Sequence, residues 1–250
     1  MHILLTNDDG IQAVGIRALY RAFVDGGHRV DVAAPITEQS AVGHAVTMAS
    51  PLRVKEFREE GFYGLGVSGT PADCVKLALS TLLDKAPDIV VSGINSGANV
   101  GVDILYSGTV SAATEGALMG LPALAASYDD FDPKDLSGQA AFAEAFIRRV
   151  DWASIPKRRV LNLNFPKGGM AGARELVVCP QTQSTYEDWF EARKDPRGRE
   201  YYWMSGAIPP ETVLPGTDRD LLTKGHVTLT PLRFDFTDRE TLAALAPVFA

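Results

Sequence analysis

The sequence predicts an α/β sandwich built on a mostly parallel β-sheet. Short apolar runs alternate with helical patterns from the N-terminus to about residue 165, and strands that alternate with helices over short connections form parallel sheets. Of the 250 residues, 46% are hydrophobic and 22% are charged, which is ordinary globular usage and enough chain to bury a sizeable core. The last third of the chain is rich in aromatic residues and predicts a different structure.

The first elements alternate in this way. Residues 3–5 form an apolar run that enters a polar loop, as a strand does at its end. A helical spacing of apolar residues follows and stops at Gly26 and Gly27, which suits the C-terminus of a helix. Residues 29–34 are predicted as a second strand, ended by Pro35.

A later helix carries clear start signals. Thr70 can be its N-cap, Pro71 stands at the first helical position, and Asp73 lies near the positive end of the helix dipole. The remaining predicted elements are strands at 88–93, 121–127 and 160–165 and helices at 109–119 and 139–150. Ligands of such folds bind at the carboxyl ends of the parallel strands, so residues just after each strand are the first candidates for a site.

The stretch at 181–203 holds six aromatic residues among 23, where the chain average of 8% would give about two. A polar turn at 193–200 separates two aromatic arms, which predicts a long projecting hairpin packed on another subunit. A hairpin packed on its own domain is the alternative. We therefore predict a catalytic core at 1–180 and a C-terminal arm for oligomerisation at 181–250, with a return strand and a terminal helix.

Charge and composition exclude several classes of protein. The 24 basic and 31 acidic residues give a net charge of −7, which argues against a nucleic-acid polymer or a membrane surface as partner. Cys74 and Cys179 form no disulfide framework. No apolar run reaches the roughly 18 residues of a membrane span, and the first residues lack the features of a signal peptide. We expect a cytoplasmic protein.

Two adjacent carboxylates, Asp8 and Asp9, follow the first predicted strand. Such a pair repels itself unless it is solvated or shares a cation, and a hard divalent metal is its natural partner at a sheet edge. A solvated acidic turn bent at Gly10 is the alternative. A second loop, after a buried strand, offers the amide oxygens of Asn95 and Asn99, which ligate Mg²⁺, Mn²⁺ or Ca²⁺ without adding negative charge.

The helix predicted at 109–119 is entered through Ser107, Gly108 and Thr109. Backbone N–H groups, hydroxyls and the helix dipole make an anion cradle there, and simple capping by Ser107 or Thr109 is the alternative. The spacing and the lysine of a P-loop are absent. After the second strand, Ser40 offers a hydroxyl to a metal or phosphate, and His44 offers an acid–base group or a purely structural side chain.

Together these four segments describe an oxygen-only cation site beside an anion-binding helix N-terminus. That combination is typical of a metal-dependent phosphate-ester hydrolase. No Cys/His cluster indicates zinc, and no GxSxG turn indicates an α/β-hydrolase.

These segments resemble the motifs of the SurE family of stationary-phase survival proteins, which are metal-dependent nucleoside monophosphate phosphatases. The matching segments are ILLTNDDG at 3–10, APITEQSAVGHAVT at 34–47, VSGTPADCVKLAL at 67–79, DIVVSGINSGANVGVDILYSGTVSAATEG at 88–116, LNLNFP at 161–166 and, more weakly, TDRDLLTKGHVTLTPL at 217–232. They follow one another over nearly the whole chain.

The resemblance implies a three-layer sandwich with a Rossmann-like sheet and a C-terminal arm exchanged in a homodimer or homotetramer. It implies one divalent cation per subunit, Mg²⁺ or Mn²⁺, with Ca²⁺ as a further option. The residues it assigns to the metal are Asp8, Asp9, Ser40 and Asn95, and those it assigns to the phosphate are Asn95, Ser107, Gly108 and Thr109. The implied activity is hydrolysis of nucleoside 5′- and 3′-monophosphates, with exopolyphosphatase activity in some members.

We predict that a metal-activated water attacks the phosphorus in line and that Asp8 or Asp9 accepts its proton. The chain departs from the family pattern at Ala41, where glycine is usual, and at His226, where an aromatic residue is usual. Two other functions compete. A haloacid-dehalogenase-type phosphatase would place its acids as DxD rather than side by side, and a nucleotide-sensing module would bind its ligand without hydrolysis.

Overall fold

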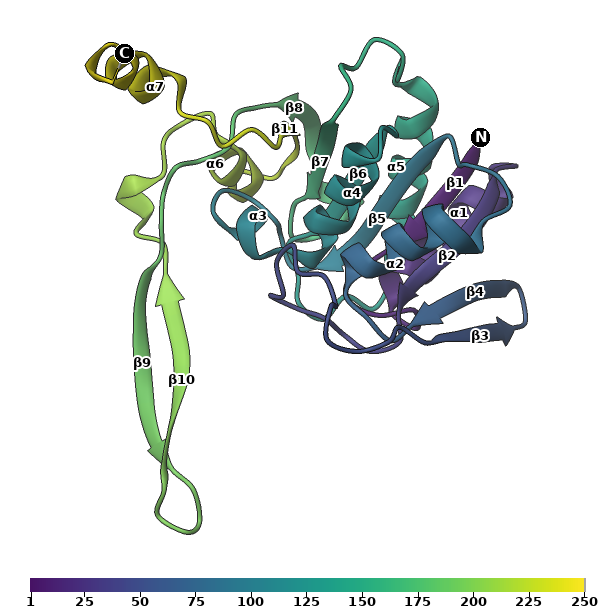
Figure 1. The fold of residues 1–250 in the computed structure, drawn as a ribbon, viewed down its shortest axis with the longest axis horizontal. Helices are drawn as coiled ribbons and strands as arrows, with labels where there is room; N and C mark the ends of the chain where they lie inside the picture. The colour runs from purple at the N-terminus through teal and green to yellow at the C-terminus, as the bar shows by residue number, and fades with distance from the viewer. Residues whose placement is uncertain (250) are drawn as a thin grey trace.

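A nine-stranded sheet forms the centre of the computed structural model, which describes residues 1–249. Its strand order is β3-β4-β2-β1-β5-β6-β7-β11-β8 (Figure 1). The strands are β1 (His2–Thr6), β2 (Arg29–Pro35), β3 (Val54–Glu59), β4 (Phe62–Val67), β5 (Ile89–Ser96), β6 (Ala123–Tyr128), β7 (Arg159–Phe165), β8 (Arg174–Val178) and β11 (His226–Arg233). The six strands from β4 to β7 run parallel, β3 is antiparallel to β4, and β11 is antiparallel to β7.

Helices cover both faces of this sheet. On one face α1 (Val14–Asp25) packs against α5 (Ser137–Arg149), and on the other α2 (Pro71–Leu77) packs against α4 (Gly108–Leu118) (Figure 1). Because successive side chains of a strand point to opposite faces, Ile3 and Leu5 of β1 enter the core under α1 and α5, while Leu4 enters the core under α2 and α4. The predicted α/β sandwich with a mostly parallel sheet is confirmed.

The start of α2 follows its sequence signals. The Thr70 hydroxyl accepts a hydrogen bond from Asp73 N at 3.1 Å, and Asp73 Oδ2 accepts one from Thr70 N at 2.9 Å. This reciprocal pair satisfies two donors that a helix start leaves without partners. The α-helix ends at Leu77, where a π-helical turn (Ala78–Leu82) continues the chain.

Three strands of the sheet, β3, β4 and β8, were not expected from the sequence, and two of them, β3 and β8, are its edges. Every side chain of β3 is at least partly exposed, and β8 begins with Arg174 and Glu175. Edge strands of this kind lack the continuous apolar run that marks a buried parallel strand. They widen the sheet on both sides and lie away from its middle strands.

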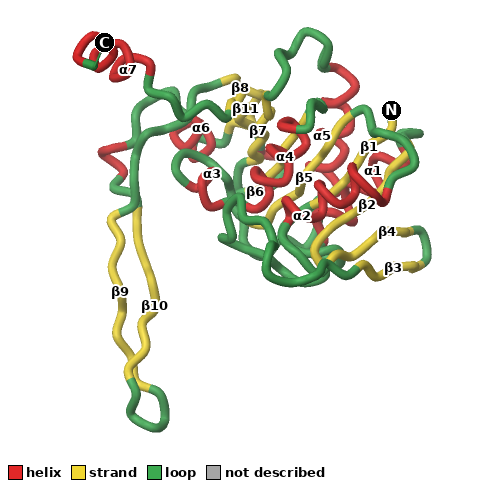
Figure 2. Tube along the Cα trace, in the orientation of Figure 1, coloured by secondary structure: helices red, strands yellow, loops and turns green. Residues whose placement is uncertain are grey.

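A two-stranded hairpin leaves the body of the molecule after β8. Its strands, β9 (Glu187–Lys194) and β10 (Glu200–Ala207), pair with each other in a separate sheet, and the hairpin extends far from the rest of the chain (Figure 2). The chain then returns through α6 (Asp218–Thr223) to β11 and ends in α7 (Arg239–Leu245). Among residues 1–249, no helix combines the length and apolar character that crossing a membrane requires.

Candidate active site

A cavity of about 500 Å³ opens at the carboxyl ends of β2, β1, β5 and β6. The chain crosses from β1 to β2 in one direction along the sheet and places β5 and β6 on the other side of β1, so the cavity lies at the switch point where open α/β sheets bind ligands. Six of the residues predicted for the site line it: Asp8, Asp9, Ser40, Asn95, Asn99 and Ser107.

The two adjacent carboxylates are held by different elements. Asp8 is buried and accepts a hydrogen bond on Oδ1 from the Thr109 hydroxyl of α4. Asp9 accepts a hydrogen bond on Oδ2 from Ser96 N, at 3.0 Å, at the end of β5. The pair is thereby fixed between two segments about a hundred residues away in the chain.

Asp8 is buried and Asp9 is half-buried, and neither carboxylate forms an ion pair with a positive charge among residues 1–249. Burial raises the pKa of Asp8, and the hydrogen bond from Thr109 opposes that rise. Burial and the neighbouring Asp8 charge raise the pKa of Asp9 to about 6. A bound cation would stabilise this acidic pair, because its positive charge offsets both the desolvation of the carboxylates and their mutual repulsion.

Asn95 and Ser40 contribute neutral oxygen atoms to the same cavity. Asn95 Nδ2 donates to Gly97 O at 2.8 Å, which commits the amide nitrogen to the protein and leaves the carbonyl oxygen as the group that can bind a metal. The Ser40 hydroxyl donates to Glu38 Oε1 at 2.6 Å and keeps its lone pairs for a ligand.

Ser107 caps the N-terminus of α4, where its Oγ accepts a hydrogen bond from Val110 N at 3.1 Å. Its own hydroxyl proton remains available to an anion in the cavity. Gly108 and Thr109 do not line the cavity but lie directly behind Asp8. A Cβ at Gly108 would stand 2.7 Å from Asp8 Cβ, so only glycine lets the helix start approach this carboxylate so closely.

The charge of the cavity is strongly one-sided. Four carboxylates line it, from Asp8, Asp9, Glu38 and Asp103, and no Lys, Arg or His of residues 1–249 does so. A phosphate anion would be repelled here unless a cation neutralised the acidic groups. The donors are two carboxylates, a hydroxyl and an amide oxygen, which is the set that Mg²⁺, Mn²⁺ and Ca²⁺ prefer.

The metal assignment depends on the neutral oxygens as much as on the carboxylates. Across residues 1–249, no three His, Cys, Asp or Glu side chains come together as a metal-binding group. The two aspartates therefore need Ser40, Asn95, water or substrate to complete a coordination shell. The chemistry of the donors fits a hard divalent cation and does not fit zinc.

His44 does not reach the cavity. Its Nε2 lies 2.8 Å from Glu115 Oε2, and Lys76 Nζ lies 2.8 Å from the other oxygen of the same carboxylate. The His44 hydrogen bond and the Lys76 charge hold the pKa of Glu115 below its ordinary value, although burial raises it. The structural interpretation of His44 is therefore the one that the geometry supports.

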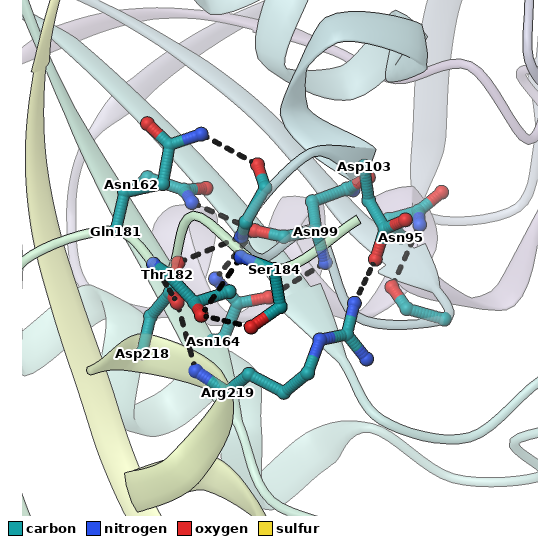
Figure 3. Close-up of polar contacts among 12 residues, drawn as sticks. Asn95, Asn99, Asp103, Asn162, Asn164, Gln181, Thr182, Ser184, Asp218 and Arg219 are labelled. Atoms are coloured by element: carbon teal, nitrogen blue, oxygen red, sulfur yellow. Dashed lines mark hydrogen bonds and ion pairs between the residues drawn. The ribbon is translucent and has the colours of Figure 1, made fainter. Parts of the chain in front are cut away.

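Asn99 lines the cavity, and its other polar groups brace the loop after β5 (Figure 3). Its backbone N–H donates to Asn164 Oδ1 at 2.8 Å, its Nδ2 donates to Ser127 Oγ at 2.8 Å, and its carbonyl accepts from Asn162 Nδ2 at 2.8 Å. These bonds tie the loop after β5 to β6 and β7. The loop leads to Asp103, the first residue of the short helix α3 (Asp103–Tyr106), which lines the cavity and which no sequence pattern had singled out.

A second brace comes from the C-terminal part of the chain. Asp218 Oδ2 accepts a hydrogen bond from Gly101 N at 2.8 Å, and its Oδ1 accepts from Thr182 N at 2.8 Å. Arg219 Nη2 donates to Asp103 Oδ2 at 2.6 Å. Figure 3 shows Asp218, Thr182, Arg219 and Asp103 close together. Sequence spacing alone could not find this contact, because it joins segments more than a hundred residues apart.

Fold and site together define an α/β protein with an acidic, oxygen-lined pocket next to the N-terminus of α4. A family model described as Survival protein SurE matches residues 3–188. The chain belongs to the SurE family.

Relatives and a solved structure agree with this family. The chain is 67% identical over 246 residues to 5′-nucleotidase SurE of Solidesulfovibrio magneticus, a match that covers 98% of this chain and 96% of the relative. It is 63% identical over 249 residues to 5′-nucleotidase SurE of Maridesulfovibrio salexigens, covering 100% and 99%. The SurE protein from Aquifex aeolicus superimposes with a TM-score of 0.84 at 34% identity, covering 99% of each chain.

Proposed function

We propose that this chain is a 5′-nucleotidase that hydrolyses nucleoside monophosphates to nucleoside and phosphate with the help of one divalent cation. The observation that carries the proposal is the meeting of Asp8, Asp9, Ser40 and Asn95 in one cavity beside the Ser107 helix start. The nucleotidase names of relatives at 63–67% identity support the substrate class.

One set of residues would bind the cation and another would bind the phosphate. Asp8, Asp9, Ser40 and Asn95 would hold the cation, with Mg²⁺ or Mn²⁺ preferred and Ca²⁺ as an option. When bound, such a cation polarises a phosphoryl oxygen and lowers the pKa of a water molecule. The Ser107 hydroxyl, with the positive end of the α4 dipole behind it, would bind the phosphate oxygens and offset their growing charge. Asp8 or Asp9 would take the proton of the attacking water.

The orientation of Asp8 is set before substrate arrives. The Thr109 hydroxyl holds one carboxylate oxygen, and the close approach of Gly108 fixes the carboxylate against the helix start. Because both groups belong to α4, the element that would bind phosphate also positions a cation ligand. Positioning of this kind reduces the reorganisation needed in the transition state.

The test is a phosphate-release panel with nucleoside 5′- and 3′-monophosphates and polyphosphate, each with Mg²⁺, Mn²⁺ or Ca²⁺ and with a chelator. We expect release from the 5′-monophosphates with Mg²⁺ or Mn²⁺, loss with chelator, and recovery when metal is returned. The 3′-monophosphates and polyphosphate test the wider activity implied by the family resemblance. Isothermal titration of the metal-free protein with Mn²⁺ gives a readout of the cation site apart from turnover.

Two results would contradict the proposal. Full activity in chelator would remove the cation from the mechanism. Saturable binding of nucleotide with metal present and without phosphate release would favour the nucleotide-sensing module instead.

We also propose that a second copy of the chain covers the hairpin, in a homodimer or homotetramer. All sixteen residues of β9 and β10 are exposed, among them Trp189, Phe190, Trp203 and Met204 at 53–69% exposure. α7 leaves Leu242 and other apolar side chains uncovered in the same way. Apolar surface of this extent is characteristic of interaction sites.

We retain the cytoplasm as the proposed compartment. Its support is chemical: Cys74 and Cys179 are both free and buried, which suits a reducing environment. The test is fractionation of cells that carry a tagged copy of the chain, and recovery outside the cytoplasmic fraction would contradict it.

A further inference from the structure

An aromatic ring stands uncovered at the rim of the otherwise polar cavity. Phe131 lines the cavity and is 87% exposed. An exposed phenyl ring lacks the stabilisation that burial normally gives an apolar side chain. The other apolar lining side chains are the small residues Ala41 and Ala98 and the half-exposed Tyr106. Phe131 is thus the largest apolar surface that the cavity offers to a ligand.

The backbone around Phe131 is constrained although its ring is uncovered. Gly97 N donates to Tyr128 O at 2.8 Å, which ties the loop after β5 to the end of β6. Asp130 Oδ1 accepts from Asp132 N at 3.3 Å and closes a turn across Phe131. The ring lies against Gly97, where a Cβ would stand 2.8 Å from Phe131 Cε1. A side chain at position 97 would therefore push the ring aside.

The cavity has two chemically different parts. The carboxylates and the start of α4 suit a cation and a phosphate group, and they offer nothing apolar to the remainder of a nucleotide. A nucleobase presents a flat π-face that stacks on aromatic side chains whatever its identity. A volume of about 500 Å³ lies within the range of small-molecule sites.

We propose that Phe131 is the specificity-determining residue on which the nucleobase of the substrate stacks. This inference rests on the proposed nucleotidase function and adds the group that distinguishes a nucleotide from a sugar phosphate. Tyr106 also lines the cavity, but it directly precedes Ser107, so its substitution would disturb the phosphate end as well. Phe131 lies on a separate loop, and its contribution can be isolated.

The experiment compares adenosine 5′-monophosphate with ribose 5-phosphate, which carries the same phosphoester without a base. The kcat/KM of wild type is measured for both substrates with the cation that supports activity, beside Phe131→Ala, Phe131→Leu and Phe131→Tyr. The exposed position lets all three variants fold. The inhibition constant of inorganic phosphate reports on the phosphate end in each variant.

We expect wild type to prefer the nucleotide, and we expect Phe131→Ala to lower the ratio of the two kcat/KM values by about 5- to 150-fold. Phe131→Leu should lower it similarly, because it keeps apolar bulk without a ring, whereas Phe131→Tyr should restore most of it. The inhibition constant of phosphate should be the same in all variants.

An unchanged ratio in Phe131→Ala would overturn the inference, as would an equal fall for both substrates or a wild-type enzyme with no preference for the nucleotide. Failure of wild type to release phosphate from either substrate is a separate result. It would overturn the proposed function itself, and the stacking role with it.

Discussion

Asp218 Oδ2 accepts a hydrogen bond from Gly101 N at 2.8 Å, across 117 positions of the chain. The carboxylate is fully buried and also accepts from the backbone N–H groups of Thr182 and Arg219. Burial raises the pKa of Asp218, while these three backbone donors and the Arg219 charge oppose the rise. Through Gly101, α6 holds the loop that leads to Asp103 and Ser107 in the cavity.

We expect Asp218→Ala to lower the free energy of unfolding by about 3 kcal/mol, because it leaves buried backbone donors without an acceptor. It should also lower kcat/KM for nucleotide, since the loop after β5 loses a brace. Urea unfolding and steady-state kinetics measure the two effects. Asp220→Ala on the same helix is the control, because Asp220 bonds only with exposed partners at Gly216 and Lys224 and should cost less than about 1 kcal/mol. Equal behaviour of the two variants would contradict this role of Asp218.

Asp8→Asn tests the cation site. The amide keeps the shape of the side chain but removes one of the two charges, so we expect phosphate release to fall by about 10²-fold or more. Titration with Mn²⁺ should show weaker binding, while circular dichroism should show an unchanged fold. Asp25→Asn, at an exposed position on α1, serves as the matched control. Wild-type turnover in Asp8→Asn would refute the metal assignment.

Ala41 stands in the left-handed region with a φ of 57°, at one of the two positions where the chain departs from the family pattern. A residue with a Cβ is strained there by about 1–2 kcal/mol, and glycine removes that strain at some cost in unfolded-chain entropy. We expect Ala41→Gly to raise the free energy of unfolding by up to about 1 kcal/mol. Thermal and urea unfolding measure the change.

Ala173→Gly is the control for Ala41→Gly. Ala173 has a φ of −70°, which alanine adopts without strain, so glycine there should destabilise the protein by about 0.4–1 kcal/mol. Destabilisation of similar size in both variants would show that Ala41 is not strained.

Asp73 makes stability depend on pH. Burial raises the pKa of Asp73, but hydrogen bonds from Thr47 and Thr70 lower it more, so the folded value lies below the ordinary 3.8. A depressed folded pKa contributes stability that is present above the unfolded value and is lost as the pH falls through the folded value. We expect Asp73→Asn to cost about 2 kcal/mol at pH 7 and progressively less below pH 4.

Urea unfolding of wild type and Asp73→Asn at pH 7, 5 and 3 measures the difference between their free energies of unfolding. The exposed Asp84→Asn controls for general charge effects. A gap between wild type and Asp73→Asn that stays constant from pH 7 to pH 3 would exclude the carboxylate as its source.

The hairpin tests assembly. Phe190 and Met204 face each other in the β9–β10 register and are 65% and 69% exposed. We expect Phe190→Asp with Met204→Asp to lower the sedimentation coefficient to that of a smaller species, because buried charge is costly at an apolar interface. Met48→Asp introduces the same chemistry at an 89% exposed position outside the hairpin and should leave assembly intact. An unchanged oligomer in the hairpin variant would contradict the proposal.

The sequence predicted those elements whose pattern is local. β1 and β5 are buried parallel strands that contain the continuous apolar runs 3–5 and 89–91, and α2 carries its capping residues in sequence. β3 and β8 escaped prediction because an edge strand can be polar and exposed. Their presence is decided by the neighbouring strand rather than by their own residues.

The same distinction applies to the site. Asp8, Asn95 and Ser107 could be selected because each follows or begins a predicted element, and strand ends of a parallel sheet converge at one edge. Asp103, Phe131 and Asp218 could not be selected, because their importance arises from loop conformation and from contacts between distant segments. The hydrogen bond from the Thr109 hydroxyl to Asp8 could likewise not be predicted from a sequence pattern.

The insertion of β11 between β7 and β8 has a consequence for biosynthesis. The ribosome makes β7 and β8 before β11. Until β11 has been translated, β7 and β8 have no strand between them and β7 keeps an unpaired edge. The backbone N–H of Gly101 likewise lacks its acceptor until Asp218 has been translated. The enzyme should therefore acquire its organised catalytic loop only in the last stage of translation, and prematurely terminated products should be inactive and prone to edge-to-edge aggregation.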